Sequence, residues 1–545
     1  MVDYIIVGGG TAGCVLANRL SEDPELSVLL IEAGPEDKKR EIHIPAAFSE
    51  LFKTDVDWAY ESVSQPDAAG RKLFLPRGKV MGGCSSINAM IYIRGHRLDY
   101  DHWADEGNQG WSYDDLLPYF RKSESNARVH DQYHGSDGPL SIVDLHDALP
   151  LSHDFVKAAT EAGAPANDDF NGEEQDGFGL YQVTQQHGKR MSAAVAFIKP
   201  IRGRKNLRIV TGAMVECLLW EGKKVVGVQL NRRGHVAWEK ARQEVILAAG
   251  AYNSPQLLLL SGIGPAAHLQ EMGIAVKSDL PGVGHNLQDH LIVPMVFDTY
   301  QQPTLQSAKS LKSIINYVMW SEGPLSSNVA EAGGFIRTRK GLPAPDIQFH
   351  FGPGYFYNHG FGIPTSGYGY SLGPTLLQPN STGTVTLASP QPQAAPRIDH
   401  QYLADEEDLQ TLVRGFQYGM KIADSPTMRK NFRGYHLPKK RLQEEGEIAD
   451  HIRQTAQTLY HPTGTAKMGH DHMAVVDDRL RVKGVEGLRV VDASVMPNIV
   501  RGNTNAAVMV IAERAADLLK ADRQAQKKVV SIPARREVLT TEQET

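Results

Sequence analysis

The strongest chemical signal in this chain of 545 residues lies in its first 34 positions. A short apolar run, Tyr4 to Val7, leads into the pattern Gly8-x-Gly10-x-x-Gly13, and a second apolar run ends on Glu32. In a strand–turn–helix–strand unit, such glycines let a pyrophosphate approach the amides of a helix N-terminus. A glycine turn in any α/β protein is the alternative, but the flanking runs and the terminal acid favour a dinucleotide site.

These residues have different expected roles. Gly8 allows the sharp turn, Gly10 leaves room for the pyrophosphate, and Gly13 lets the helix pack closely on the strand. Glu32 can accept hydrogen bonds from both ribose hydroxyls of an adenosine. Because a carboxylate there would repel a 2′-phosphate, NADP is disfavoured.

A second glycine-rich stretch covers residues 76–91 and contains Gly82-Gly83-Cys84-Ser85-Ser86. Two glycines followed by small polar residues make a loop whose backbone can press against a flat or phosphorylated ligand. A purely structural glycine turn explains the same residues equally well. Taken alone, the stretch leaves both interpretations open.

Composition limits the class of protein. The length exceeds that of a comfortable single core, which predicts two or more domains or one large composite domain. Hydrophobic residues make up 41% and charged residues 22%, which is typical of a globular protein. The net charge of −6 argues against a nucleic-acid partner, which would need a basic face.

The cysteines and the lack of long apolar runs indicate the cellular compartment of the protein. Cys14, Cys84 and Cys217 fit neither a disulfide framework nor a zinc site, so we expect buried cysteines in a reducing compartment and no metal. The dinucleotide motif begins at residue 3, which leaves no room for a cleaved signal peptide. No run of about 18 apolar residues could form a membrane span. We therefore expect a cytoplasmic protein, with peripheral membrane association left open.

Further strands and helices must position the first unit. Apolar, β-rich runs predict strands at 206–211, 215–220, 225–231, 244–249 and 488–492. After Ala249 we expect a helix capped near Asn253 or Ser254, with Pro255 in its first turn. The pattern also predicts a helix over 506–520 and a frayed, charged tail after Ala521.

The character of the chain changes between about 291 and 455. Aromatic stretches, Gly/Pro loops and alternating strands such as 383–387 surround an amphipathic helix over 407–423. The predicted fold class is α/β, a Rossmann-like nucleotide-binding domain with a second substrate domain made of a mainly antiparallel β-sheet plus helices. The nucleotide-binding domain is assigned to 1–150, 201–290 and 456–520, the substrate domain to 151–200 and 291–455, and a tail to 521–545.

Five motifs, in this order along the chain, resemble the glucose–methanol–choline (GMC) oxidoreductases. Besides the first glycine motif they are Gly78 to Asn88, Gly250 to Gly264, Tyr460-His461-Pro462 to Gly469, and Gly502-Asn503-Thr504-Asn505. The resemblance runs from residue 3 to about 520. It implies an extended FAD, with adenosine at the first unit and isoalloxazine between the domains; glycine spacing alone could not separate FAD from NAD.

The resemblance also implies where FAD would bind. Thr11 and Ala12 would meet the pyrophosphate, Val215 would contact the adenine through its backbone, and Asn505 would reach the pyrimidine edge. The segment Asn88, Ala89, Met90 and Ile91 would face the flavin ring, and Asp492 and Ala493 would hold the ribityl–phosphate portion. The remaining implied FAD-binding residues are Gly8, Gly10, Gly13, Glu32, Ala33, Val80, Gly82, Ala249 and Gly250. Ile87 stands where some choline oxidases carry a histidine bonded to flavin, which predicts non-covalent FAD.

The catalytic residues are implied by the same resemblance. His461 matches the family's catalytic histidine, which would remove the hydroxyl proton of an alcohol while hydride leaves carbon for flavin N5. Its partner position falls on Asn503, which can hold the substrate oxygen by a hydrogen bond. A flavoprotein lyase of the hydroxynitrile type and a non-catalytic nucleotide-binding scaffold are the alternatives. The presence of both residues argues against the scaffold.

The substrate is less clearly indicated. The aromatic stretch 346–361 contains His350 and Tyr355, which we take as substrate residues, although a packed strand and an exposed loop explain it equally well. Glu331 could meet a cation such as choline, but a salt bridge within the fold is the favoured interpretation. With no basic cluster for an anionic substrate, we expect a neutral primary or secondary alcohol, whether aliphatic, aromatic or sugar-like. Choline stays an alternative.

The electron acceptor is not decided by the sequence. A quinone, a dye-like acceptor or oxygen would each serve, because oxygen reactivity depends on access and charge near the flavin. A homodimer is left open.

Overall fold

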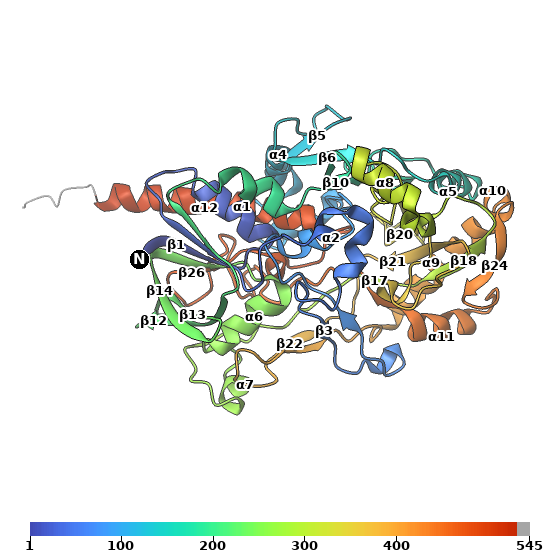
Figure 1. Cartoon of the computed structure of the whole chain (residues 1–545). Helices are drawn as coiled ribbons and strands as arrows, with labels where there is room; N and C mark the ends of the chain where they lie inside the picture. Colours follow the sequence, from blue (N-terminus) through green and yellow to red (C-terminus); the bar gives the residue numbers. More distant parts are fainter. Residues whose placement is uncertain (531–545) are drawn as a thin grey trace, which may run out of the picture.

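The computed structural model describes residues 1–530, and its two large sheets lie toward opposite ends of an elongated molecule (Figure 1). The first sheet has the strand order β11-β2-β1-β14-β13-β12, with β26 also paired to β14. Its strands are β1 (Val2–Val7), β2 (Val28–Ile31), β11 (Leu207–Val210), β12 (Met214–Glu221), β13 (Lys224–Arg232), β14 (His235–Leu247) and β26 (Leu488–Val490).

The core of this sheet is parallel, as the first predicted unit requires. β1 pairs in parallel with both β2 and β14. On the outer sides, β2 pairs in parallel with β11, and β14 pairs in parallel with β26. All four residues of β2 and five of six in β1 are buried, because helices cover a parallel sheet on both faces. The helices α1 (Thr11–Leu20) and α12 (Asn505–Val530) pack on each other, although the chain enters them almost 500 residues apart.

The second sheet is antiparallel throughout, with the order β24-β18-β21-β20-β19-β7. Its strands are β7 (Gly177–Leu180), β18 (Met295–Thr299), β19 (Ala332–Ile336), β20 (Ile347–Gly352), β21 (Gly369–Leu376) and β24 (Phe432–Leu437). In addition, β17 (Leu291–Ile292) pairs with β21, and β25 (Gln457–Thr458) pairs with β17. The helix α9 (Glu406–Ala423) packs on β21, and α5 (Pro150–Glu161) and α11 (Glu445–Thr455) pack against α9. The α/β fold class with an antiparallel second sheet is confirmed. The division into residue ranges stays a prediction, and β25 lies outside the range assigned to the substrate domain.

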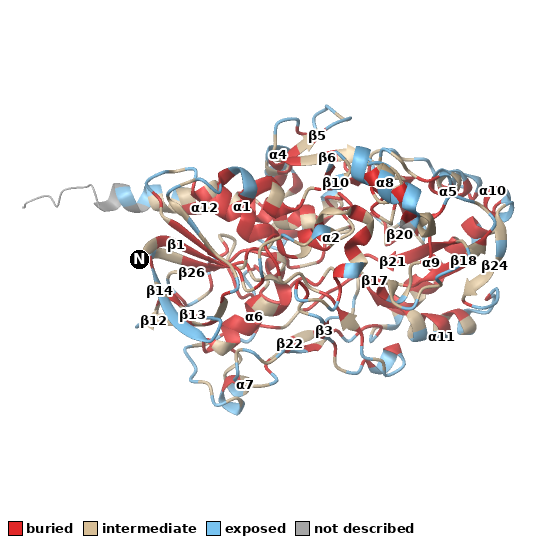
Figure 2. Cartoon of the chain, in the orientation of Figure 1, coloured by how far each residue is buried: buried red, intermediate tan, exposed pale blue. Residues whose placement is uncertain are grey.

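The remaining elements are short. The helices are α2 (Arg40–His43), α3 (Arg97–Asp105), α4 (Tyr113–Ser123), α6 (Gly250–Leu260), α7 (Ala266–Glu271), α8 (Leu311–Trp320) and α10 (Pro426–Arg429), with a 3₁₀ turn, η1, at Pro45–Leu51. The strands are β3 (Tyr60–Glu61), β4 (Phe74–Leu75), β5 (Glu124–Asn126), β6 (Leu140–Asp144), β8 (Gln182–Val183), β9 (Gln185–Gln186), β10 (Lys189–Arg190), β15 (Ile263–Gly264), β16 (Ser278–Asp279), β22 (Thr384–Thr386) and β23 (Arg397–Asp399). In Figure 2 the strands of both sheets are mostly buried, whereas the outer side of α8 is exposed.

The start of α6 differs from the prediction. The helix begins at Gly250, because the Asp492 carboxylate accepts from the Gly250 amide at 2.9 Å and so caps the helix from a distant segment. Ser254 lies inside the helix and donates to the same carboxylate. Pro255 therefore lies in the helix interior, where it cannot donate to the Ala251 carbonyl. The Thr465 hydroxyl donates to that carbonyl instead, at 2.6 Å.

Two further expectations are wrong in part. The segment after Ala521 continues α12 to Val530, because Asp522 pairs with the buried Arg489 and Arg523 pairs with Asp23. The rest of the predicted tail, 531–545, lies outside the described residues. Of the three cysteines only Cys14 is buried; Cys84 and Cys217 are partly exposed.

Candidate active site

A long cavity runs between the two sheets. It is lined by the first glycine motif, by the segment 76–91, by the start of α6 and α12, and by residues of β20 and β21. Every residue predicted to bind FAD lines it except Gly13, Val80 and Gly82. His461, Asn503 and His350 line it as well.

The three exceptions support the cavity wall. A Cβ on Gly13 would lie 1.9 Å from the Gly8 carbonyl oxygen, so this glycine allows α1 to approach the preceding turn. Gly82 has φ +90° and packs against Ser86, and Val80 is fully buried among apolar side chains. These three residues therefore lie behind the cavity lining and support it.

The nucleotide end of the cavity fits a pyrophosphate. The N-cap of α1 is Gly10, which offers no side-chain oxygen, and no acidic residue lies in the first turn. The first amides of α1 and the positive end of its dipole are therefore left for an anion. The Thr11 hydroxyl donates to the Asn505 side chain at 2.8 Å, which brings the N-terminus of α12 to the same point.

Glu32 is buried at this end, at the tip of β2. Its two carboxylate oxygens accept from the amides of Gly9 and Gly34, both at 2.7 Å. Burial raises the pKa of Glu32 to about 7, although these amides oppose the shift. Each oxygen keeps a second lone pair, which suits the ribose hydroxyls of a bound nucleotide.

The middle of the cavity is shaped by residues 87–91. Met90 has φ 58°, and its amide donates to the Asn88 side-chain oxygen at 3.0 Å, which holds a tight turn toward the cavity. Behind this turn the buried Arg190 donates to Asn88 Oδ1 at 2.8 Å and to the carbonyls of Ser85 and Ile42. Burial lowers the pKa of Arg190 to about 9. A fixed turn of this kind can support the flat ring system of a flavin.

His461 lies at the other end, and its hydrogen bonds define which nitrogen carries its proton. His290 Nε2 is 3.0 Å from the Leu377 carbonyl, which can only accept, so this nitrogen of His290 is protonated. Burial lowers the pKa of His290 to about 3, so the ring is neutral and its Nδ1 is an acceptor. His461 Nδ1 lies 2.9 Å from that atom and must donate to it. The lone pair of His461 therefore resides on Nε2.

The free nitrogen of His461 faces Asn503. The Nδ2 amide group of Asn503 lies 3.4 Å from His461 Nε2, and its Oδ1 accepts from Gln348 Nε2 at 3.2 Å. Burial, together with the neighbouring His290, His350 and Arg77, lowers the pKa of His461 well below its usual value. The arrangement holds a neutral base beside an amide donor, which is what removal of a hydroxyl proton requires.

The two predicted substrate residues are placed differently. His350 lines the cavity, with Nδ1 3.2 Å from the Thr375 hydroxyl and a buried Nε2 that has no partner among the described residues. Tyr355 does not line it; its hydroxyl donates to Asp298 at 2.6 Å. Tyr355 is buried in the segment after β20, so packing within the fold explains it better than contact with a substrate.

Sequence reasoning missed the residues that contact His461 and Asn503. His290 and Asp289, whose carboxylate accepts from the His461 amide at 2.7 Å, stand directly before β17 and had no role predicted from the sequence. Gln348 is buried in β20. A polar Asp-His pair between apolar runs was the available signal.

Glu331 does not reach the cavity. Its buried carboxylate accepts from the hydroxyls of Ser152 and Ser327 and from the Leu149 amide, so it is neither a cation site nor part of a salt bridge. Among the described residues that line the cavity, Glu32 and Asp492 are the only carboxylates, and both bond backbone amides at the nucleotide side. Asp289 is the acid next to His461, but its carboxylate bonds the His461 amide and the hydroxyls of Thr458 and Tyr402 and does not line the cavity, so it is not placed to neutralise a cationic substrate.

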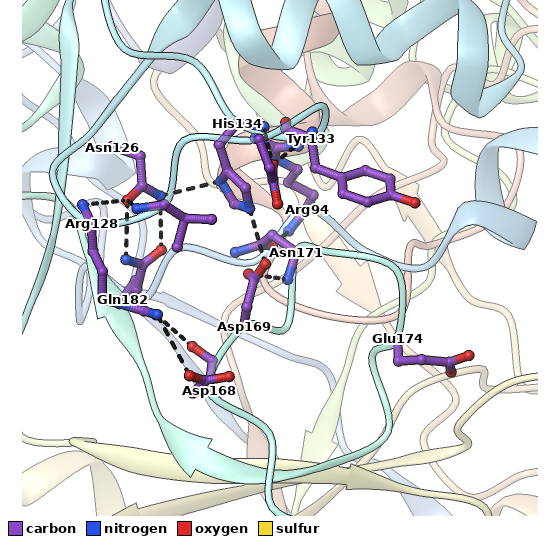
Figure 3. A network of polar contacts seen from close by, with 12 residues as sticks. Arg94, Asn126, Arg128, Tyr133, His134, Asp168, Asp169, Asn171, Glu174 and Gln182 are labelled. Atoms are coloured by element: carbon purple, nitrogen blue, oxygen red, sulfur yellow. Dashed lines mark hydrogen bonds and ion pairs between the residues drawn. The ribbon is translucent and has the colours of Figure 1, made fainter.

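A second polar cluster lies away from the cavity (Figure 3). His134 contacts Glu124 at 2.8 Å through Nδ1 and Asp169 at 3.1 Å through Nε2. Burial opposes the charge, but these two carboxylates raise the pKa of His134 to about 9. Asp131 also lies close by. Both ring nitrogens of His134 contact carboxylates and Arg94 pairs with Glu124, so this group is an ion network.

Family models, sequence relatives and a solved structure all match most of this chain. The N-terminal and C-terminal GMC oxidoreductase models match residues 2–292 and 379–512. The chain is 46% identical over 528 residues to alcohol dehydrogenase [acceptor] of Pseudomonas putida, covering 95% of this chain and 96% of that protein. It is 43% identical over 532 residues to mitochondrial choline dehydrogenase of Homo sapiens, covering 95% and 89%. Pyridoxine 4-oxidase from Mesorbium loti superposes with a TM-score of 0.88 at 35% identity, covering 97% and 99%.

Proposed function

The chain belongs to the GMC oxidoreductase family and is an FAD-dependent oxidoreductase of the alcohol-oxidising type, and we propose that it oxidises a neutral primary or secondary alcohol to the carbonyl compound. The observation that carries the proposal is the lone pair of His461 Nε2, held beside Asn503. In the proposed reaction the hydroxyl proton passes to His461 Nε2. FAD, when bound, supplies the acceptor for the hydride that leaves the carbinol carbon.

The surrounding residues have distinct proposed roles. Asn503 donates to the substrate oxygen through Nδ2 and so orients it toward the base. His290 keeps the proton of His461 on Nδ1, which leaves Nε2 free to accept. His350 Nε2, buried and without a partner among the described residues, offers a further polar contact for the substrate oxygen. General base catalysis of this kind contributes roughly 10²–10⁴-fold.

The lining near His461 supports a neutral substrate. Phe48, Phe52 and Phe356 give apolar surface there, and among the described residues no carboxylate lines this part of the cavity. A quaternary ammonium would have only the aromatic faces to bind its charge, with no carboxylate beside them. Such faces bind a cation most strongly when they form a desolvated cage. The name of the 46% identical relative agrees with an alcohol substrate and an acceptor other than NAD.

The test is a steady-state comparison with a dye acceptor. Neutral primary and secondary alcohols should give a higher kcat/KM than choline, and a higher value for choline would overturn the proposed substrate class. Repeating the assay with oxygen in place of the dye separates a dehydrogenase from an oxidase. We propose the dehydrogenase, so the dye should support the faster turnover.

A further inference from the structure

Helix α8 turns its apolar side to solvent. Six of its ten residues are large and apolar, with exposed fractions of 73% for Leu311, 43% for Ile314, 50% for Ile315, 68% for Val318, 64% for Met319 and 62% for Trp320. A surface helix normally buries such a stripe. Contiguous apolar patches of this kind on a folded protein mark sites of association.

The inward side of α8 is polar and firmly held. The Tyr317 hydroxyl contacts the carbonyls of His43 and Gly188 at 3.3 and 3.2 Å, and the Ser313 hydroxyl donates to the Ser307 carbonyl at 2.8 Å. Ser310 caps the helix by accepting from the Ser313 amide. These bonds fix the rotation of the helix, so its exposed face is the one that the fold presents.

We propose that this face, the α8 face, docks on the surface of a lipid bilayer. A stable protein interface takes about 20–30 residues from each partner, and six side chains on a helix about 15 Å long fall well short of that. A short helix that carries aliphatic residues and a tryptophan outward is sufficient to lie in the interfacial region of a membrane. Among the described residues no helix is both long and apolar enough to cross one.

The charges around the α8 face fit an anionic surface. On α8, on α2 and on the β9–β10 hairpin beneath it, the exposed charged side chains are Arg40, Lys189 and Lys312, while Glu41 is half-buried. Glu322, directly after the helix, is exposed as well, so three basic side chains stand against two acidic ones. This small basic excess contrasts with the net charge of −6 for the whole chain. Basic residues near an anionic leaflet strengthen binding.

The α8 face is connected to the substrate end of the cavity. The chain runs from α8 to Val329, which lines the cavity, and on the way the Leu325 carbonyl accepts from the Ala46 amide in η1 at 3.2 Å. The same 3₁₀ turn carries Phe48 into the cavity wall. Docking would therefore hold this wall beside the bilayer, whatever the substrate of the enzyme proves to be.

The test is sedimentation of the FAD-loaded enzyme with unilamellar vesicles, either of phosphatidylcholine alone or mixed with phosphatidylglycerol. The unmodified enzyme should sediment with the vesicles, and more strongly with the anionic mixture. The Val318→Glu/Met319→Glu double variant should lower the partition coefficient by at least about tenfold. Its turnover of a water-soluble alcohol should not change.

A matched pair of single substitutions gives the control. Trp320→Gln should weaken vesicle binding, whereas Trp238→Gln should not, because Trp238 is 64% exposed but lies on β14, away from α8. Failure of the unmodified enzyme to bind either vesicle would overturn the proposal. So would equal loss in the two tryptophan variants. Light scattering that shows a dimer, converted to monomer by the double variant without vesicle binding, would assign the face to a second copy instead.

Discussion

His290 can be tested as the residue that sets the tautomer of His461. In the structure its Nδ1 accepts the proton of His461 Nδ1 at 2.9 Å, and its Nε2 donates to the Leu377 carbonyl. His290→Leu keeps a side chain of similar volume but removes both bonds. His290→Gln retains a side-chain oxygen that can accept from His461.

The magnitude follows from the lost acceptor. A buried N–H left without a partner costs about 1–3 kcal/mol, and this cost falls only on the reactive tautomer, which carries its proton on Nδ1. The population of that tautomer should drop by roughly 5-fold to 150-fold. The rate of flavin reduction at saturating alcohol should drop by the same factor, which is less than the loss on removing the base itself.

The assay is anaerobic stopped-flow absorbance, which follows bleaching of the oxidised flavin band after mixing with alcohol. The Leu variant should be slow, and the Gln variant should recover part of the rate with unchanged flavin content. A Leu variant that reduces its flavin at the parent rate would refute the assigned tautomer. A Gln variant as slow as the Leu variant would show that packing, and not hydrogen bonding, is the role of His290.

Three further outcomes are expected. His461→Ala should keep FAD but slow flavin reduction by roughly 10²–10⁴-fold in the same assay, and Asn503→Ala should slow it less; the reverse order would contradict the assigned roles. Acid or heat precipitation should release intact FAD into the supernatant, because Ile87 offers no atom for a covalent link; flavin retained in the pellet would contradict this. Acidification should destabilise the protein steeply, because burial lowers the pKa of His290, His350 and His400 each to about 3, while the same residues unfolded bind protons near pH 6.5. The unfolded state then binds up to three more protons, so the free energy of unfolding should fall by up to about 4 kcal/mol per pH unit between about pH 6 and pH 4, as denaturant titrations at each pH would measure; a flat profile would contradict it.

The sequence predicts well what local patterns encode. The apolar runs at β1 and β2 are buried strands, and Gly10 stands at a helix N-terminus that lacks a capping side chain, as the glycine motif implies. These features depend on residues within one strand–turn–helix unit. The start of α6 was predicted less well, because its cap is Asp492, which lies 242 residues away from Gly250.

The candidate site shows the same limit. His461 and Asn503 could be identified because each belongs to a motif with its own residue pattern. His290 lies 171 residues before His461, and the pairing of β17 with β25, together with the bridge between Gln288 and Thr463, brings its loop to that histidine. Tyr355 had an aromatic neighbourhood that resembles a pocket wall, yet its hydroxyl bonds Asp298 inside the fold. Long-range contacts, which leave no local trace, account for both.

The joining of the two ends of the chain in the first sheet has a consequence for biosynthesis. β26 pairs with β14, and Asn505 accepts from Thr11 across 494 positions of sequence. A ribosome adds about 5–20 residues per second, so the glycine motif waits for tens of seconds before its partners emerge. Asp492 and Asn505 are added only after every strand of both sheets has been made. The proposed flavin cradle is therefore complete only after β26 has been made, and a nascent chain stalled before β26 should not yet retain the cofactor.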